Sequence, residues 1–205
     1  MSSDLSTQMA TNRILRSMAP AQREADPAGD LVLSIGLNED RQLIRVSSKV
    51  LTLASPVFSA LLSPKFTESR SLADSTEVPQ IPFPEDNPEA MVWLCQALHF
   101  KKRPTDEISF PLVKDLAVLC DKYDLSIALG SWSELWMQKW RGSVQGADHF
   151  PQMLWISYAL DHQNRFWEMS RALKRVYTSK DLVLASKELT TGILPDRVLG
   201  KCPLY

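Results

Sequence analysis

Strand-forming sequence is concentrated in one short part of this chain, and almost everything after it has helical periodicity. Apolar residues alternate along 31–35, turn-forming residues follow over 36–41, and apolar residues return over 43–46. Alternating apolar runs on either side of a turn predict a β-hairpin. Because the strands come early and the helices later, we predict an α+β fold and not a parallel sheet interleaved with helices.

Two short helices are predicted immediately after the hairpin. Ser47 or Ser48 can cap the first of them, because a serine hydroxyl can accept a hydrogen bond from a free backbone N–H of the first turn. In the second helix Ser55 has the capping position, and Pro56 follows at the first helical position, where its missing N–H is not needed. These signals predict a pair of short helices packed as a hairpin.

An edge strand and further helices complete the predicted order. Residues 76–84 are apolar and extended, but Pro79 and Pro82 lack the N–H that a central strand donates, so this strand is expected at a sheet edge. Asn87 and Pro88 then have the pattern of a helix start. Apolar spacing predicts the remaining helices within residues 112–123, 132–140, 151–160, 164–178 and 181–190, with a last short one from Pro195.

The chain is long enough for one domain with an appendage. It has 205 residues, of which 44% are hydrophobic and 23% are charged, as is usual for globular proteins. Residues 1–28 are rich in Ser, Ala, Gln and charged residues and are expected to form a flexible tail. We predict an α+β domain over residues 29–128 and a helical extension over residues 129–205.

Charge, cysteine content and hydropathy narrow the class of protein further. The net charge of −1 provides no attraction for the phosphates of a nucleic acid. Cys95, Cys120 and Cys202 form no Cys-x-x-Cys pair, which favours a reducing compartment such as the cytoplasm or the nucleus. No apolar run has signal-peptide length or approaches the roughly 18 residues that a membrane span needs. We therefore expect no binding to nucleic acid or to a membrane.

The sequence has no pattern of residues that predicts catalysis. His99, His149 and His162 are the only histidines, and none has a second His or Cys at the spacing of a zinc site. The seven glycines are scattered, and neither a Gly-x-Gly-x-x-Gly nor a Walker pattern is present. We therefore expect no enzymatic activity, no metal or cofactor, and no small-molecule substrate.

The predicted order of elements resembles that of BTB/POZ domains, and particular positions strengthen the resemblance. Asp30 opens the first strand, where an Asp commonly stands in that family. The other matches, which with Asp30 extend over about half of the chain, are Val50 and Leu51, Ser55, Phe58, Phe66 with Glu68, Ala117, and the Asp-Lys-Tyr-Asp-Leu run at 121–125. The resemblance implies a fold that binds other proteins and does no chemistry of its own.

The chain departs from animal BTB domains at one pair of positions. Ser47 and Ser48 stand where those domains usually carry His followed by Arg or Lys, and Val-Ser-Ser-Lys is closer to short fungal BTB proteins. In animal domains the Asp and the basic pair line a charged groove near the dimer interface, which places the groove here at Asp30, Ser47 and Ser48. The departure weakens the expectation of a homodimer through this groove. The alternative role of Asp30 is to cap and orient the first strand.

A short motif after the second helix suggests a partner. Phe66-Thr67-Glu68 resembles the loop of cullin-binding BTB proteins that presents a hydrophobic side chain and a carboxylate to the cullin. The resemblance implies an adaptor for a cullin-type ubiquitin-ligase scaffold or for another BTB chain. The expected partner-binding residues are Phe66, Glu68, Leu62 and Tyr123. The alternative is that Phe66 packs on the core and Glu68 is solvated.

Two features of the helical extension have more than one interpretation. Trp132, Trp136 and Trp140 recur at steps of four, which predicts either core packing or an exposed partner surface. Residues 165–180 are locally basic, which fits a solvated helix face, an acidic partner or a nucleic acid. Contact with nucleic acid through this helix would make the chain a transcription- or chromatin-associated regulator, the alternative to an adaptor. The basic residues concerned are Arg165, Arg171, Lys174, Arg175 and Lys180, against Glu168.

Overall fold

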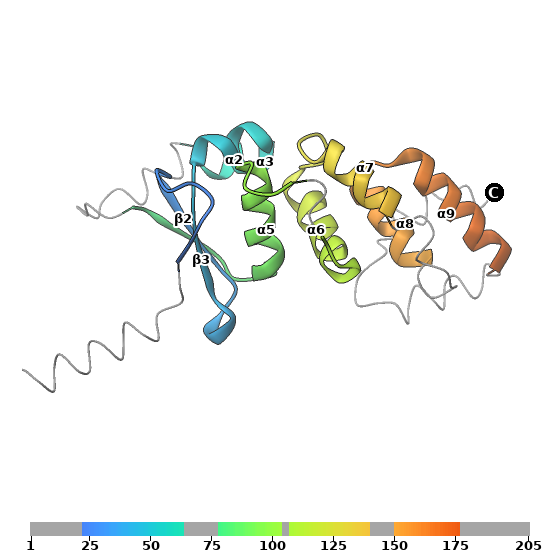
Figure 1. The fold of residues 1–205 in the computed structure, drawn as a ribbon, viewed down its shortest axis with the longest axis horizontal. Helices are drawn as coiled ribbons and strands as arrows, with labels where there is room; N and C mark the ends of the chain where they lie inside the picture. Colours follow the sequence, from blue (N-terminus) through green and yellow to red (C-terminus); the bar gives the residue numbers. More distant parts are fainter. Residues whose placement is uncertain (1–21, 64–77, 104–106, 140–149, 177–205) are drawn as a thin grey trace, which may run out of the picture.

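The computed structural model describes residues 22–63, 78–103, 107–139 and 150–176. In chain order the elements are β1 (Gln22–Glu24), β2 (Leu31–Ile35), the 3-10 helix η1 (Asn38–Asp40), β3 (Gln42–Val46), α2 (Ser48–Ala54), α3 (Pro56–Leu61), β4 (Gln80–Phe83), α5 (Pro88–Leu98), α6 (Phe110–Tyr123), α7 (Gly130–Lys139), α8 (Phe150–Ala159) and α9 (Gln163–Val176). The sheet lies at one end of the molecule and α7 to α9 at the other, with α5 and α6 between them (Figure 1).

The sheet is mixed and has the strand order β1-β3-β2-β4. Strands β2 and β3 pair antiparallel, with Leu33 opposite Ile44, as the predicted hairpin requires. Strand β4 pairs parallel with β2 and lies at the edge of the sheet. This edge position is the one expected from Pro79 and Pro82. The predicted α+β class is confirmed.

Strand β1 differs from the expectation of a tail that runs to residue 28. Gln22, Arg23 and Glu24 are exposed, so their polar composition gives no sign of a strand. The strand pairs parallel with β3, and the fully buried Ala25 follows it and donates its N–H to the carbonyl of Arg45 at 2.9 Å. Burial of one small residue and backbone pairing, not an apolar pattern, therefore bring this segment into the sheet.

Local capping signals define the starts of three helices. The Ser55 hydroxyl accepts a hydrogen bond from the N–H of Phe58 at 2.9 Å in α3. The side chain of Asn87 accepts one from Ala90 at 3.0 Å in α5, and both helices have Pro at their first positions, as predicted. Ser109 caps α6 in the same way. Such caps can be predicted from the sequence because the donor and the acceptor are only three residues apart.

The buried residues form one core that continues from the sheet through α5 and α6 into α8. Helix α5 is buried around nearly its whole circumference, as its position between other elements requires. Trp93 of α5 lies edge-on to two tryptophans of α7, with ring centroids 5.3 Å from Trp132 and 5.4 Å from Trp136. Trp136 is buried and Trp132 partly buried, which favours the core interpretation of this stripe, whereas Trp140 lies outside the described residues.

Helices α8 and α9 form a tight hairpin. Asp161 adopts a left-handed conformation with φ of 56°, and the N–H of His162 returns to the carbonyl of Ser157 at 2.8 Å. Two of the predicted helices, 181–190 and the one from Pro195, lie outside the described residues, as do His149 and Cys202. Among the described residues, no helix combines the length and the apolar character that a membrane span requires.

Candidate functional site

The residues expected to line a groove meet at the start of α2. The two carboxylate oxygens of Asp30 accept hydrogen bonds from Ser48, one from its backbone N–H at 2.7 Å and one from its hydroxyl at 2.6 Å. Burial would raise the pKa of Asp30, but these hydrogen bonds together outweigh it, so the pKa lies below its usual value. Asp30 thus has the geometry of a cap, although it caps α2 and not its own strand.

The backbone N–H of Ser47 is also held by a distant side chain. It donates to Nε2 of His99 at 2.9 Å, while Nδ1 of His99 lies 2.7 Å from the carbonyl of Cys95. This arrangement requires a neutral imidazole with its proton on Nδ1, because Nε2 is the acceptor. Ser47 occupies the cap position, but its hydroxyl makes no capping bond. The predicted serine cap of α2 is therefore wrong: Asp30 and His99 satisfy these backbone groups.

Tyr123 was expected to bind a partner, and its position corrects that prediction. The residue is only 2% exposed, and its ring stacks on Phe58 with centroids 4.5 Å apart. Its carbonyl accepts a hydrogen bond from the Ser55 hydroxyl at 2.5 Å. Tyr123 thus joins the end of α6 to α3, and a partner has no access to its ring.

The hydroxyl of Tyr123 points to a buried acid that sequence reasoning missed. Asp86, 5% exposed, accepts a hydrogen bond from Tyr123 and another from Lys122 at 2.6 Å. Burial and the bond to Asp86 raise the pKa of Tyr123. The Pro-Glu-Asp-Asn-Pro run around Asp86 has the composition of an exposed turn, so no local signal marks this residue as buried.

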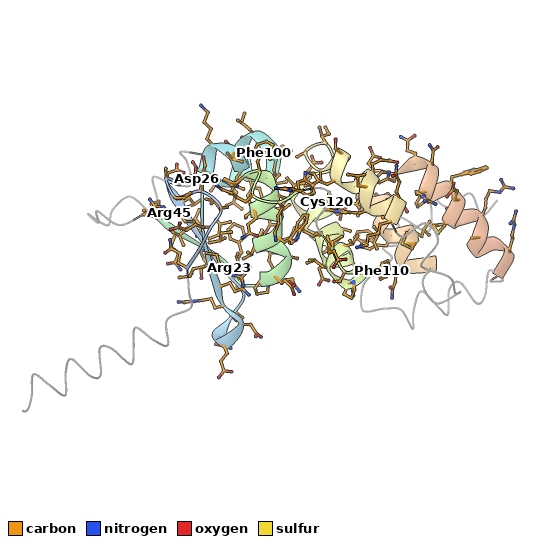
Figure 2. The ribbon with its side chains drawn as sticks, viewed as in Figure 1. Arg23, Asp26, Arg45, Phe100, Phe110 and Cys120 are labelled. Carbon is orange, nitrogen blue, oxygen red and sulfur yellow. The ribbon has the colours of Figure 1, made fainter. Side chains whose placement is uncertain are left out.

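Of the other three residues expected to bind a partner, only Leu62 lies within the described part of the chain. Leu62 follows α3 and is partly buried against the core, which leaves part of its side chain accessible. Phe66 and Glu68 lie outside the described residues, and their roles stay predictions. Large apolar side chains are exposed at two other positions: Leu53 of α2 is 79% exposed, and Phe100, which follows α5, is 91% exposed. Phe100 is labelled in Figure 2.

A Ser-His-Glu arrangement joins α7 to the start of α9. The Ser133 hydroxyl donates to the carbonyl of Gly130 at 2.8 Å, so it accepts from Nε2 of His162, also at 2.8 Å. Nδ1 of His162 lies 3.5 Å from a carboxylate oxygen of Glu134. These spacings resemble a hydrolase triad, but Ser133 is 1% exposed and its proton is already donated to the backbone. The arrangement can stabilise the helix junction, but it does not present Ser133 to a substrate.

The two cysteine thiols of the described residues, Cys95 and Cys120, are buried in the core. Burial raises the pKa of the Cys95 and Cys120 thiols to about 12, which leaves both protonated and poorly nucleophilic at neutral pH. Within residues 22–63, 78–103, 107–139 and 150–176, no group of three or more His, Cys, Asp or Glu side chains could hold a metal ion.

The basic helix predicted over residues 165–180 corresponds in part to α9. Arg165 is paired with Glu168 at 2.5 Å and also donates to the carbonyl of Met137 at 3.3 Å. Arg171 lies over the ring of Trp167, with 4.5 Å between its guanidinium carbon and the ring centroid. Lys180 lies beyond the described residues.

The chain was compared with protein-family models and with curated proteins. No family model matches it, and no curated protein matches it significantly.

Proposed function

We propose that this chain is a non-enzymatic protein-interaction module, with a BTB/POZ domain over residues 29–128 followed by a helical extension. One observation supports this assignment above others: three of the residues that resemble the BTB pattern, Ser55, Phe58 and Tyr123, are in direct contact. Ser55 caps α3 and donates to the carbonyl of Tyr123, and the ring of Phe58 stacks on that of Tyr123. Asp30 caps α2. Residues far apart in the sequence thus stabilise the same fold through direct contacts, which explains why the chain contains all of them.

The partner that fits this module best is a cullin-type ubiquitin-ligase scaffold. Phe66 would insert as an apolar anchor into a groove of the cullin, and Glu68 would fix the register through polar contacts. The partly accessible Leu62, four residues before Phe66, would extend the apolar contact. The adaptor would therefore act by binding alone, and the helical extension would have to supply any surface for a substrate.

A recovery experiment tests the cullin contact. Tagged full-length chain and its Phe66→Ala/Glu68→Ala variant are incubated with purified cullin N-terminal domains, and the cullin retained is measured. A matched control is available, because Leu37 and Glu39 have the same hydrophobic-x-Glu spacing and are both exposed, with Leu37 62% exposed just before η1 and Glu39 within it. We expect Leu37→Ala/Glu39→Ala to retain cullin and Phe66→Ala/Glu68→Ala to lose it. Equal recovery by the two variants, or none by the unmodified chain, would exclude this contact.

A second BTB chain is the other partner that the resemblance implies. The exposed side chains of Leu53 and Phe100 support a protein contact, because large apolar side chains in water favour association. Sedimentation of the full-length chain over a range of concentrations would detect a dimer. A Leu53→Glu/Phe100→Glu variant should then sediment as a monomer, whereas Ile127→Glu, at another exposed apolar position, should not. A concentration-independent monomer of the unmodified chain would rule out self-association.

The alternative of a transcription- or chromatin-associated regulator has less support. It depends on a continuous basic face, and in α9 Arg165 is already paired with Glu168. A nucleic acid is bound chiefly through many phosphate contacts, and among the described side chains of α9 only Arg171 and Arg175 are both basic and exposed. Retention of the full-length chain on DNA that declines steeply with salt would nevertheless favour this alternative.

A further inference from the structure

Helix α9 leaves about half of a tryptophan side chain exposed. The helix packs inward through other residues, since Phe166 and Met169 pack against the core and Ser170 is buried. Trp167 is 52% exposed. Tryptophan is highly buried on average, and where it is left in water its large apolar area favours contact with another molecule. The exposed ring is therefore a candidate contact residue.

Two arginines continue the same side of the helix. Arg171 and Arg175 follow Trp167 at intervals of four residues, which places the three on one side of α9, and both arginines are exposed. Among the described residues, neither arginine has an ion pair with an acid, in contrast to Arg165, which pairs with Glu168. We call Trp167, Arg171 and Arg175 the Trp-Arg stripe. Its two guanidinium groups therefore have no direct ion pair with an acid of the described residues.

Trp167, but neither arginine of the stripe, lines two hollows. The larger, about 630 Å³, lies between α7 and α9 and has Glu134, Gln138 and Trp167 on its walls. The smaller, about 380 Å³, has the rings of Tyr158, Phe166 and Trp167 on its wall. Either volume accommodates a large side chain of a partner, and the aromatic wall of the smaller one suits an apolar side chain. Trp167 thus stands between two places where a partner could insert.

We propose that the Trp-Arg stripe is a docking site for an acidic protein segment. An apolar side chain of that segment packs against Trp167 in the smaller hollow, and its carboxylates pair with Arg171 and Arg175. Arginine binds carboxylates through two parallel hydrogen bonds, and tryptophan and arginine are the residues that most often dominate protein interfaces. The cation–π contact already holds Arg171 over Trp167, which lowers the entropy lost on binding.

The acids beside the stripe favour a peptide over a nucleic acid. Glu134, Asp161 and Glu168 line the larger hollow, and a strand with a phosphate at every nucleotide would bring negative charge close to them. A peptide can place acidic residues opposite Arg171 and Arg175 and neutral residues elsewhere. A protein segment can vary its charge from residue to residue in this way, whereas a nucleic acid carries a negative phosphate at every nucleotide.

Fluorescence anisotropy with the full-length chain tests the site. The probe is a labelled peptide of Glu-Glu-Leu repeats, and the reference peptide has Gln in place of each Glu. We expect the acidic peptide to bind, and Trp167→Ala or Arg171→Glu/Arg175→Glu to weaken binding by about tenfold or more. The matched control is Arg41→Glu/Lys49→Glu, which changes the net charge equally at exposed positions outside α9 and should retain binding.

Several outcomes would overturn the assignment. These are no binding of the acidic peptide, equal binding of the Gln peptide, or an equal loss in the control variant. Tighter binding of a labelled single-stranded oligonucleotide than of the acidic peptide, with the same dependence on Arg171 and Arg175, would assign the surface to nucleic acid instead. All of these variants leave Phe66 and Glu68 unchanged, so the result is independent of the cullin experiment.

Discussion

The hydroxyl of Tyr123 donates a hydrogen bond to the buried carboxylate of Asp86, and this bond joins the last turn of α6 to the loop between β4 and α5. Lys122 occupies the other oxygen, so each oxygen of Asp86 has a donor. The next residue, Asn87, caps α5. The position of α5, a helix with most of its residues buried, is thus coupled to the end of α6 through one acid.

Replacement of Tyr123 by Phe is expected to lower the free energy of unfolding by about 1–2 kcal/mol, because one oxygen of the buried carboxylate loses its donor. The effect depends on pH. The pKa of Tyr123 is raised in the folded state, so its stabilising contribution is complete below the unfolded value of about 10 and declines as the pH rises above it. Urea unfolding from pH 7 to pH 11 measures both effects, and the Phe variant should lack the tyrosine component of the alkaline decline.

A double-mutant cycle isolates the contact between these two residues. Asp86→Ala, Tyr123→Phe and the double variant are compared by urea unfolding, because alanine leaves no side-chain acceptor for the tyrosine hydroxyl. Because the two groups share a hydrogen bond, the double variant should lose less stability than the sum of the single variants. Additive losses would mean that the bond between Asp86 and Tyr123 does not stabilise the fold.

Asp30 is expected to stabilise α2 as a cap. Asp30→Ala should lower stability by about 1 kcal/mol, as for other helix caps, and Asp30→Asn by less, because an amide oxygen can still accept from Ser48. The pKa of Asp30 is lowered, so its contribution is present above the unfolded value of about 3.9 and is lost as the pH falls through the folded value. Urea unfolding between pH 3 and pH 7 measures this effect. As the pH falls, the free energy of unfolding should decrease less for Asp30→Asn than for the exposed control Asp40→Asn.

The parts of the fold that were predicted correctly are those with local signals. Ser55 and Asn87 cap helices whose N–H groups are three residues away, and Pro79 and Pro82 restrict β4 to an edge whatever the rest of the chain does. Each of these effects acts within a few residues. Sequence alone therefore determines them before any tertiary structure is considered.

The parts that were missed depend on contacts across the chain. Asp86 is buried only because α6 brings Lys122 and Tyr123 to it from 36 and 37 residues away. Tyr123 lies in the run that resembles a BTB motif, but a residue of such a motif can be a core residue, and Tyr123 is buried. The caps of α2 likewise come from Asp30, 18 residues before Ser48, and His99, 52 residues after Ser47. No pattern within one element predicts such pairings.

Buried thiols provide a further test of the core. In a Cys202→Ser variant only Cys95 and Cys120 remain, and both should resist a thiol reagent in the native protein and react fully in urea. Burial raises both pKa values to about 12, so protonated thiols are favoured by folding. Their contribution is complete below the unfolded value of about 8.5 and declines as the pH rises towards 12. Rapid labelling of the native variant at pH 8 would contradict this burial.

Phe100 is expected to be a position where glycine stabilises the chain. Its φ of 59° is left-handed, a conformation that is unfavourable by roughly 1 kcal/mol or more for residues with a Cβ, and its side chain is 91% exposed and loses little packing on removal. Phe100→Gly should therefore raise the free energy of unfolding by up to about 1 kcal/mol. Ile127→Gly, at an exposed position with negative φ, should instead lower it, because glycine there only adds freedom to the unfolded chain. If Phe100→Gly lowered stability as Ile127→Gly does, the ring of Phe100 would have to make contacts that offset its backbone strain.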